Sequence, residues 1–209
     1  MIYGVILNDA ASLRRIGPLD GAPYKGAPKA PVLYIKPANT VASNGAVVRL
    51  PAGSSSVEIG TTVGVVFGRD VSRIAPAEVQ GAIEGYVLAA DLSLPHASYY
   101  RPAIREKCFD GACPLGSITP AQAVGDVREL TLHTWVDGER VESRSLAELV
   151  RDVPTLVAEV SAFMTLQRGD ILLVGVCWQA AQAGVGARVR VEADRLGAVE
   201  FQLAESPEV

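Results

Sequence analysis

The chain has 209 residues, of which 49% are hydrophobic and 20% are charged, and its formal net charge is −4 at pH 7. This balance is typical of a globular protein and excludes an intrinsically disordered one. The 19 Lys and Arg residues are outnumbered by 23 Asp and Glu residues, which argues against nucleic-acid binding. No apolar stretch approaches the roughly 20 residues that cross a bilayer, and the first residues form no basic leader. We therefore expect a cytoplasmic protein without a membrane partner, folded as one domain over residues 1–209.

The first half of the chain is dominated by short β-branched and apolar runs, each bounded by Gly, Pro or Asp. Such runs predict strands. Segments rich in Gly, Pro, Ser and Lys between them predict loops. In chain order we expect a surface loop over 9–31, a strand over 32–36, a connector over 52–56, a strand over 63–67, a short helix from Pro76 to before Gly85, and a strand over 86–90.

A hairpin is predicted near the middle of the second half. Residues 130–136 alternate apolar and polar side chains, which is typical of a half-buried strand. Asp137-Gly138 is a preferred pair for a tight turn, and residues 140–142 would return antiparallel. A strand over 171–174 and a second hairpin, formed by 187–193 and 198–203, complete a mixed, mainly β fold with a few helices.

One long helix is predicted between these strands. Apolar residues recur at three- and four-residue steps over 146–163, which predicts one buried helix face. Ser145 with Glu148 three places later fits a capping box at its start. Pro154 should kink this helix or split it, because proline lacks the amide donor and crowds the preceding turn.

The cysteines and histidines give little indication of a site. Three cysteines, an odd number, do not indicate a disulfide framework, and neither histidine lies near them at a zinc-binding spacing. We expect the cysteines to be small apolar fillers. We expect His96 and His133 to be surface residues or residues with satisfied hydrogen bonds.

Several segments together carry a resemblance to a known family. Residues 63–68 are Val-Gly-Val-Val-Phe-Gly, and residues 85–93 are Gly-Tyr-Val-Leu-Ala-Ala-Asp-Leu-Ser. With 107–111 and 163–175, their order and spacing resemble the fumarylacetoacetate hydrolase family over nearly the whole chain. The resemblance implies that family's mainly β fold.

The resemblance also implies a divalent-cation site with missing ligands. In the family, a Glu-x-Glu pair immediately precedes the first segment, and an Asp in the second segment completes a site for Mg²⁺ or Mn²⁺. The Glu positions fall here on Gly60 and Thr62, whereas the Asp is present as Asp91. Glu58 would lie on the same strand face and could substitute. We expect a cation to bind this chain weakly or not at all.

Other segments resemble one branch of the family, the isomerase/decarboxylases of 4-hydroxyphenylacetate degradation. Their carboxy-terminal half keeps the metal ligands, and their amino-terminal half departs from them as this chain does. The resemblance implies a subunit that works with a homologous metal-bearing chain, or in a homo-oligomer, on a small 2-oxo or 2-hydroxy dienoic diacid. The implied steps are decarboxylation of 5-oxopent-3-ene-1,2,5-tricarboxylate and isomerisation of 2-hydroxyhepta-2,4-diene-1,7-dioate. The matching segments are 22–25, 93–95, 99–104 and 107–114.

Four further residues are candidates for substrate contact. Lys36 and Lys107 could stabilise an enolate or bind a substrate carboxylate, or could serve as structural partners of a nearby Asp. Arg101, beside two tyrosines, could bind a carboxylate or pack on the rings. Asp110 is the fourth candidate.

Two other functions stay open. One is a metal-independent tautomerase that uses Lys36 or Lys107. The family commonly places a His shortly after an Asn near its first strand, but here no His occurs before His96, so a proton carrier is missing at that position. The other is a non-catalytic member of the family that binds a small molecule or has a structural role.

Overall fold

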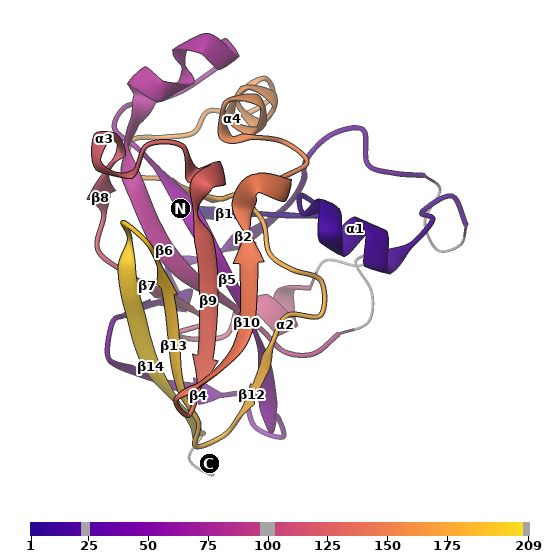
Figure 1. The fold of residues 1–209 in the computed structure, drawn as a ribbon, viewed down its shortest axis with the longest axis vertical. Coiled ribbons are helices and arrows are strands. Elements are labelled where there is room, and N and C mark those ends of the chain that lie inside the picture. The colour runs from indigo at the N-terminus through magenta and orange to yellow at the C-terminus, as the bar shows by residue number, and fades with distance from the viewer. Residues whose placement is uncertain (22–25, 97–102, 207–209) are drawn as a thin grey trace.

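Two β-sheets packed face to face form the centre of the molecule in this computed structural model, which describes residues 1–21, 26–96 and 103–206 (Figure 1). The larger sheet follows the order β2-β1-β11-β5-β6-β7-β3, with β12 paired to β5 and β8 to β6. Its strands are β1 (Ile2–Ile6), β2 (Val32–Lys36), β3 (Val41–Ser43), β5 (Ser56–Phe67), β6 (Ile83–Ser93), β7 (Cys113–Leu115), β8 (Thr119–Pro120), β11 (Ile171–Leu173) and β12 (Gln182–Gly184).

The smaller sheet follows the order β10-β9-β13-β14-β4. Both predicted hairpins lie in it and are confirmed. Asp137 and Gly138 have φ angles of 51° and 87°, as a tight turn with two left-handed residues requires. The strands are β4 (Ala46–Leu50), β9 (Thr131–Val136), β10 (Glu139–Ser145), β13 (Arg188–Ala193) and β14 (Gly197–Glu205).

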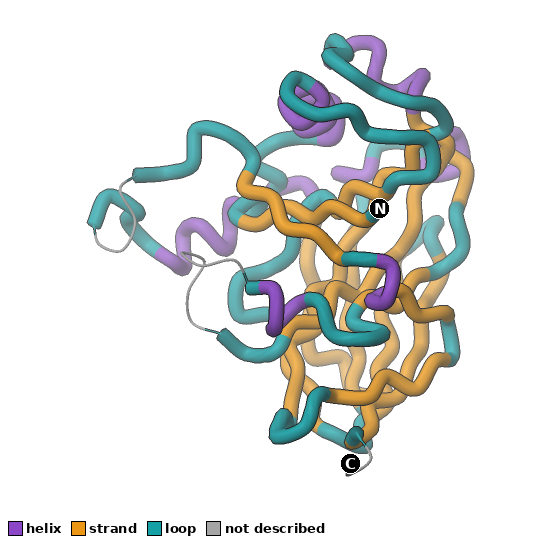
Figure 2. The backbone as a smooth tube through the Cα atoms, turned by 180° about the vertical axis from the view of Figure 1, so that it is seen from behind, coloured by secondary structure: helices purple, strands orange, loops and turns teal. Residues whose placement is uncertain are grey.

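The helices are short and lie outside the sheets. Figure 2 shows them at the ends and sides of the strand layers. The mainly β fold with a few helices is therefore confirmed. They are α1 (Ala10–Ile16), α2 (Ile104–Lys107), α3 (Ala121–Val124) and α4 (Val153–Ser161), with 3₁₀ turns η1 (Ala38–Thr40), η2 (Pro76–Ala82), η3 (Val127–Glu129) and η4 (Leu146–Glu148).

The single long helix expected over 146–163 is wrong. The segment contains the 3₁₀ turn η4 and then α4, and the Asp152 carboxylate caps α4 by accepting from the Thr155 amide at 2.9 Å. Pro154 lies in the first turn of α4, where its missing N–H costs no hydrogen bond. The Ser145 hydroxyl caps only the 3₁₀ turn, through the Ala147 amide at 3.2 Å.

The expected loop over 9–31 is also partly wrong, because it contains helix α1. The Asp9 carboxylate accepts hydrogen bonds from the Ser12 amide at 2.7 Å and the Ser12 hydroxyl at 2.5 Å, which fixes the first turn. Seven residues with Arg14 and Arg15 near the end are too few to show a clear apolar period. Figure 1 shows α1 to one side of the sheets.

Strands β5 and β6 form a long antiparallel pair. One face of this pair is buried against the smaller sheet, and the other face points away from it. Odd-numbered residues of β5, such as Ile59 and Val63, belong to the apolar core shared with the smaller sheet. Even-numbered residues point to the opposite face. In the antiparallel register Gly60 pairs with Asp91 and Glu58 with Ser93, so these residues share that opposite face.

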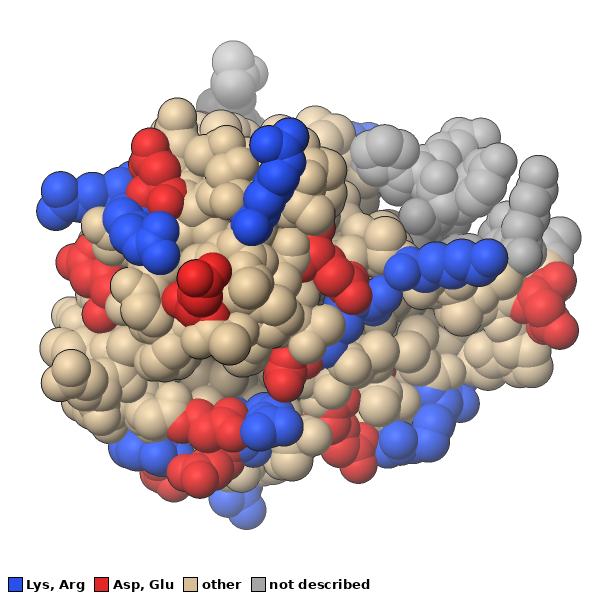
Figure 3. All heavy atoms as spheres, turned by 90° about the horizontal axis from the view of Figure 1, so that it is seen from above, with Lys and Arg blue, Asp and Glu red and all other residues tan. Residues whose placement is uncertain are grey.

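The surface shows no gathering of one charge in the view of Figure 3, where acidic and basic side chains are interspersed. Among the described residues, no helix is both long and apolar enough to cross a membrane.

Candidate functional site

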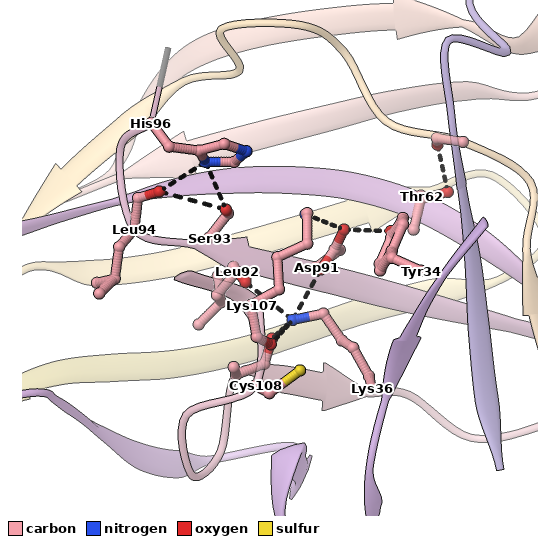
Figure 4. Close-up of polar contacts among 12 residues, drawn as sticks. Tyr34, Lys36, Thr62, Asp91, Leu92, Ser93, Leu94, His96, Lys107 and Cys108 are labelled. Carbon is pink, nitrogen blue, oxygen red and sulfur yellow. Dashed lines mark hydrogen bonds and ion pairs between the residues drawn. The ribbon is translucent and has the colours of Figure 1, made fainter. Parts of the chain in front are cut away.

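Asp91 is the centre of a buried polar cluster on the face of the larger sheet that points away from the smaller one. It lies near the end of β6, and Tyr34 and Lys36 reach it from β2, while Lys107 reaches it from α2 (Figure 4). Tyr34 and Lys36 are two residues apart on one strand, so their side chains share a face. We call these four residues the lysine–aspartate cluster.

Each carboxylate oxygen of Asp91 has a cationic partner. Lys36 Nζ lies 2.8 Å from Oδ1, and Lys107 Nζ lies 2.9 Å from Oδ2. The Tyr34 hydroxyl also donates to Oδ2. Burial by itself would raise the pKa of Asp91, but the charges of Lys107 and Lys36 and the hydrogen bond from Tyr34 lower it to about 2. The carboxylate is therefore ionised at neutral pH.

Lys36 has a structural role within the cluster. Its ammonium donates three hydrogen bonds of 2.8 Å, to the carbonyls of Leu92, Lys107 and Ala112. An ammonium has three N–H donors, so all of them are used. The contact with Asp91 is therefore purely an ion pair. Lys36 ties β6 to α2 and to the segment that follows α2.

Lys107 is less completely bound. Among the described residues, its ammonium donates one hydrogen bond, to Asp91, and lies 4.5 Å from the centroid of the Tyr34 ring. Burial is the main cause that lowers the pKa of Lys107, and the Asp91 charge opposes it. With both lysines protonated, two positive charges face one negative charge within the cluster.

Gly4 on β1 makes room for the tyrosine of the cluster. Gly4 pairs with Tyr34 in the register of β1 and β2. A Cβ atom at position 4 would lie 2.0 Å from Tyr34 Cζ, so any side chain there would displace the ring. Neither Gly4 nor Tyr34 was a predicted site residue, because the contact exists only once the strands pair.

Gly60 and Thr62, the positions where the resemblance implies glutamates, lie on the same face of the sheet as Asp91 and are closed. A Cβ atom on Gly60 would lie 2.7 Å from Val176 Cγ1 and 2.9 Å from the Asp91 carbonyl oxygen. The Thr62 hydroxyl donates to the Gly175 carbonyl at 2.6 Å. Segment 175–176, which follows β11, thus covers both positions.

Glu58 and His96 lie at one end of the cluster. Burial raises the pKa of Glu58, whereas the nearby charges of His96 and Lys107 oppose the rise. His96 Nδ1 lies 3.0 Å from the Leu94 carbonyl oxygen and 3.3 Å from the Ser93 hydroxyl. These contacts involve the Nδ1 side of the ring, and the position of His96 near Glu58 was not predicted.

The remaining candidates are not part of the cluster. The Asp110 carboxylate accepts from Asn39 Nδ2 at 2.7 Å and lines a separate open hollow with Phe109 and Arg49. Arg101 lies outside the described residues. The three cysteine thiols are unpaired, and burial raises the pKa of Cys113 and of Cys177 to about 12.

The fold and this site define a two-sheet β protein with a buried Asp on its long central strand. The sequence model described as "Fumarylacetoacetate (FAA) hydrolase C-terminal" matches residues 1–204. The chain belongs to the fumarylacetoacetate hydrolase family.

Two curated relatives show which members of the family this chain is similar to. The chain is 36% identical over 188 residues to the 4-hydroxyphenylacetate degradation bifunctional isomerase/decarboxylase of Escherichia coli, a match that covers 90% of this chain and 43% of the relative. It therefore spans less than half the length of that protein. It is 31% identical over 154 residues to an oxaloacetate tautomerase of Escherichia coli K12, covering 71% of this chain and 70% of the relative.

Solved structures agree on the fold. The 5-carboxymethyl-2-hydroxymuconate delta-isomerase of Mycobacterium smegmatis is 26% identical, with a TM-score of 0.84, covering 99% of this chain and 79% of that one. The maleylpyruvate hydrolase of Sphingobium sp. SYK-6, solved with manganese(II) and pyruvate, is 25% identical, with a TM-score of 0.80, covering 99% and 70%. Members of this fold family thus bind Mn²⁺.

Proposed function

We propose that this chain is one subunit of an isomerase/decarboxylase of the 4-hydroxyphenylacetate type, and that a homologous chain supplies the metal. The 36% identity to the bifunctional relative over 90% of this chain supports this type of activity. Its substrates would be the dienoic diacids of that pathway, a tricarboxylate that is decarboxylated and a 2-hydroxy dienedioate that is isomerised.

The observation that carries this proposal is the closure of the cation site. Mg²⁺ and Mn²⁺ are hard cations that need several oxygen ligands, mostly carboxylates and water. Both Asp91 oxygens already contact ammonium groups, and these groups would repel a divalent cation. Val176 occupies the space where a side chain at position 60 would begin. The residues present do not fit the family's cation.

Neither remaining oxygen donor rescues the site. The Thr62 hydroxyl is neutral and already donates to the Gly175 carbonyl. Glu58 lies two residues further along β5, about 7 Å from position 60 at the usual rise of a strand. Its register partner is Ser93 rather than Asp91. We propose that the metal-dependent steps take place on the homologous chain, while this chain completes the assembly.

Co-expression with a metal-bearing homologue encoded in the same genome tests the proposal. Each chain and the mixture would be assayed for isomerisation of 2-hydroxyhepta-2,4-diene-1,7-dioate, with metal content measured on each purified sample. We expect co-purification, full activity only in the mixture, and one bound metal per pair of chains. Full activity of the homologue alone, without association, would contradict the proposal and would favour a non-catalytic role for this chain.

A further inference from the structure

We propose that the segment 174–178 is a strap that opens and closes over β5, and that Arg144 on β10 holds it in the closed position. Opening uncovers Gly60 and Thr62, and with them the face of the sheet on which Asp91 lies. This conformational device goes beyond the proposed function, because it belongs to the chain by itself and requires neither a partner nor a metal.

The strap is buried although it lies outside the helices and strands. It connects β11 to β12, and no helix or strand is present between Leu173 and Gln182, all of which the structure describes. Val174 and Val176 are nonetheless almost completely buried. Buried backbone groups outside a helix or sheet need other hydrogen-bond partners. The position of the strap therefore depends on the side chains that reach it.

Arg144 contacts the strap near its beginning. The Arg144 Nη1 atom donates to the Gly175 carbonyl at 2.8 Å, and the Thr62 hydroxyl donates to the same oxygen at 2.6 Å. The next residue is Val176, whose Cγ1 would lie 2.7 Å from a Cβ atom at position 60. The guanidinium thus fixes the residue that directly precedes the one covering β5.

Arg144 also reaches the end of the strap, through α1. Its Nε atom donates to Asp9 Oδ1 at 3.1 Å, and Asp9 Oδ2 accepts from the Ser12 hydroxyl. The Ser12 oxygen in turn accepts from the Trp178 amide at 2.8 Å. These three side chains belong to buried residues. One guanidinium therefore ties both Gly175 and Trp178 to the body of the molecule.

Two features of the closed position favour opening. Arg144 Nη2 is buried and has no hydrogen-bond partner among the described residues, so its donors gain partners when water enters. Gln179, directly after the strap, has a φ of 51°, a left-handed conformation that is strained for a residue with a side chain. The ties to Arg144 thus hold the strap against a free-energy cost that opening releases.

Amide hydrogen exchange of the native chain tests the proposal. The Trp178 amide is hydrogen-bonded to Ser12 in the closed position, so its exchange reports each opening. We expect it to exchange faster than the hydrogen-bonded amides of β11, at a rate that low urea concentrations do not change, because a local opening exposes little surface. Exchange at the β11 rate with the same urea dependence would overturn the proposal, since the strap would then open only on global unfolding.

Two variants remove ties at Gly175 and leave the acceptor of the Trp178 amide unchanged. Thr62→Val and Arg144→Met each remove a hydrogen bond to the Gly175 carbonyl. Each should speed exchange of the Trp178 amide about fivefold, the usual effect of one hydrogen bond. Arg144→Met also leaves the buried Asp9 without its counter-charge and can unfold the chain, so Thr62→Val is the deciding variant.

Thr40→Val is the matched control for Thr62→Val. Thr40 is also buried, and its hydroxyl donates to the Pro37 carbonyl at 2.7 Å, in the turn η1. The control loses the same kind of hydrogen bond without touching the strap, so the exchange rate of the Trp178 amide should stay at the native value. Equal rates for this amide in Thr62→Val and Thr40→Val would contradict the proposal.

Discussion

Asp91 has a negative charge that the surrounding residues of the cluster more than neutralise. Two ammonium groups lie within 2.9 Å of its oxygens, and all three charged side chains are almost completely buried. A buried carboxylate is stabilised by its cationic partners, and the buried ammonium groups in turn need the carboxylate as their counter-charge. The sequence left open whether Lys36 and Lys107 contact a substrate or serve as structural partners of an Asp. Both contact Asp91, and within the described part of the chain Lys36 uses all three donors on carbonyls, whereas Lys107 donates one hydrogen bond.

Replacement of Asp91 by Asn should be strongly destabilising. The change leaves two buried ammonium groups without a counter-charge, which costs about 3–5 kcal/mol of unfolding free energy. Urea unfolding of Asp91→Asn measures this loss. Asp110→Asn is the matched control, because Asp110 is exposed and accepts a hydrogen bond from the neutral Asn39 amide. A loss below about 1 kcal/mol at Asp91 would show that the cluster is not a buried ion-pair network.

Stability should also fall in acid because of the same residue. The pKa of Asp91 is about 2 in the folded chain, against an ordinary value of 3.8. A lowered folded pKa stabilises the protein above the unfolded value, and this contribution disappears as the pH falls from about 4 towards 2. Its size is about 2 kcal/mol. The native chain should lose this amount on acidification, as measured by urea unfolding, and Asp91→Asn should lack that part of the loss. Equal losses in both proteins would refute the assignment.

At the scale of elements, the segment after β11 determines which side chains of β5 have space beside Asp91. Val176 lies against Gly60, and the Gly175 carbonyl binds the Thr62 hydroxyl. The glycine at position 60 and the valine at position 176 therefore form a complementary pair from two elements that are far apart in sequence. Neither residue alone explains the closed site.

A double-mutant cycle measures this complementarity. Gly60→Ala should destabilise the native chain by about 1–3 kcal/mol, because its Cβ overlaps Val176. The same change should cost less in a Val176→Ala background, where the nearest contact at 2.7 Å has been removed. The difference is the coupling energy, and chemical unfolding of the four proteins provides it. Additive effects would mean that Val176 does not fill the space beside Gly60.

At the scale of the whole molecule, the family sequence model matches residues 1–204. The positions at which the resemblance implies cation-binding glutamates hold Gly60 and Thr62. This combination is the basis of the proposed division of labour between two homologous chains.

The thermal unfolding midpoint of this chain alone should not rise when Mn²⁺ is added. A ligand that binds the folded state raises the midpoint according to its affinity, and the residues around Asp91 do not fit the cation. Differential scanning fluorimetry with millimolar Mn²⁺ measures the effect, with the metal-bearing homologue as positive control. A rise that disappears in Asp91→Asn would overturn the proposed loss of the metal site.

The sequence by itself determined β2, β6, β11, the second half of β5, both hairpins and the family, because these depend on local periodicity, turn residues and the order of motifs. Strands β1, β3, β4, β7, β8 and β12 were not predicted. The sequence also singled out Lys36, Lys107 and Asp91 through that family pattern. The prediction of one long helix over 146–163 was wrong for a local reason. The Asp152 cap and Pro154 start a new helix within an apolar pattern that is otherwise continuous.

Only the tertiary structure decided how the centre is built. Tyr34 and Asp91 are 57 residues apart, and the Thr62–Gly175 contact joins residues that are 113 apart. Such contacts follow from strand register and from the path of the segment after β11, which no local pattern encodes. The same holds for His96, whose place beside Glu58 results from the pairing of β5 with β6.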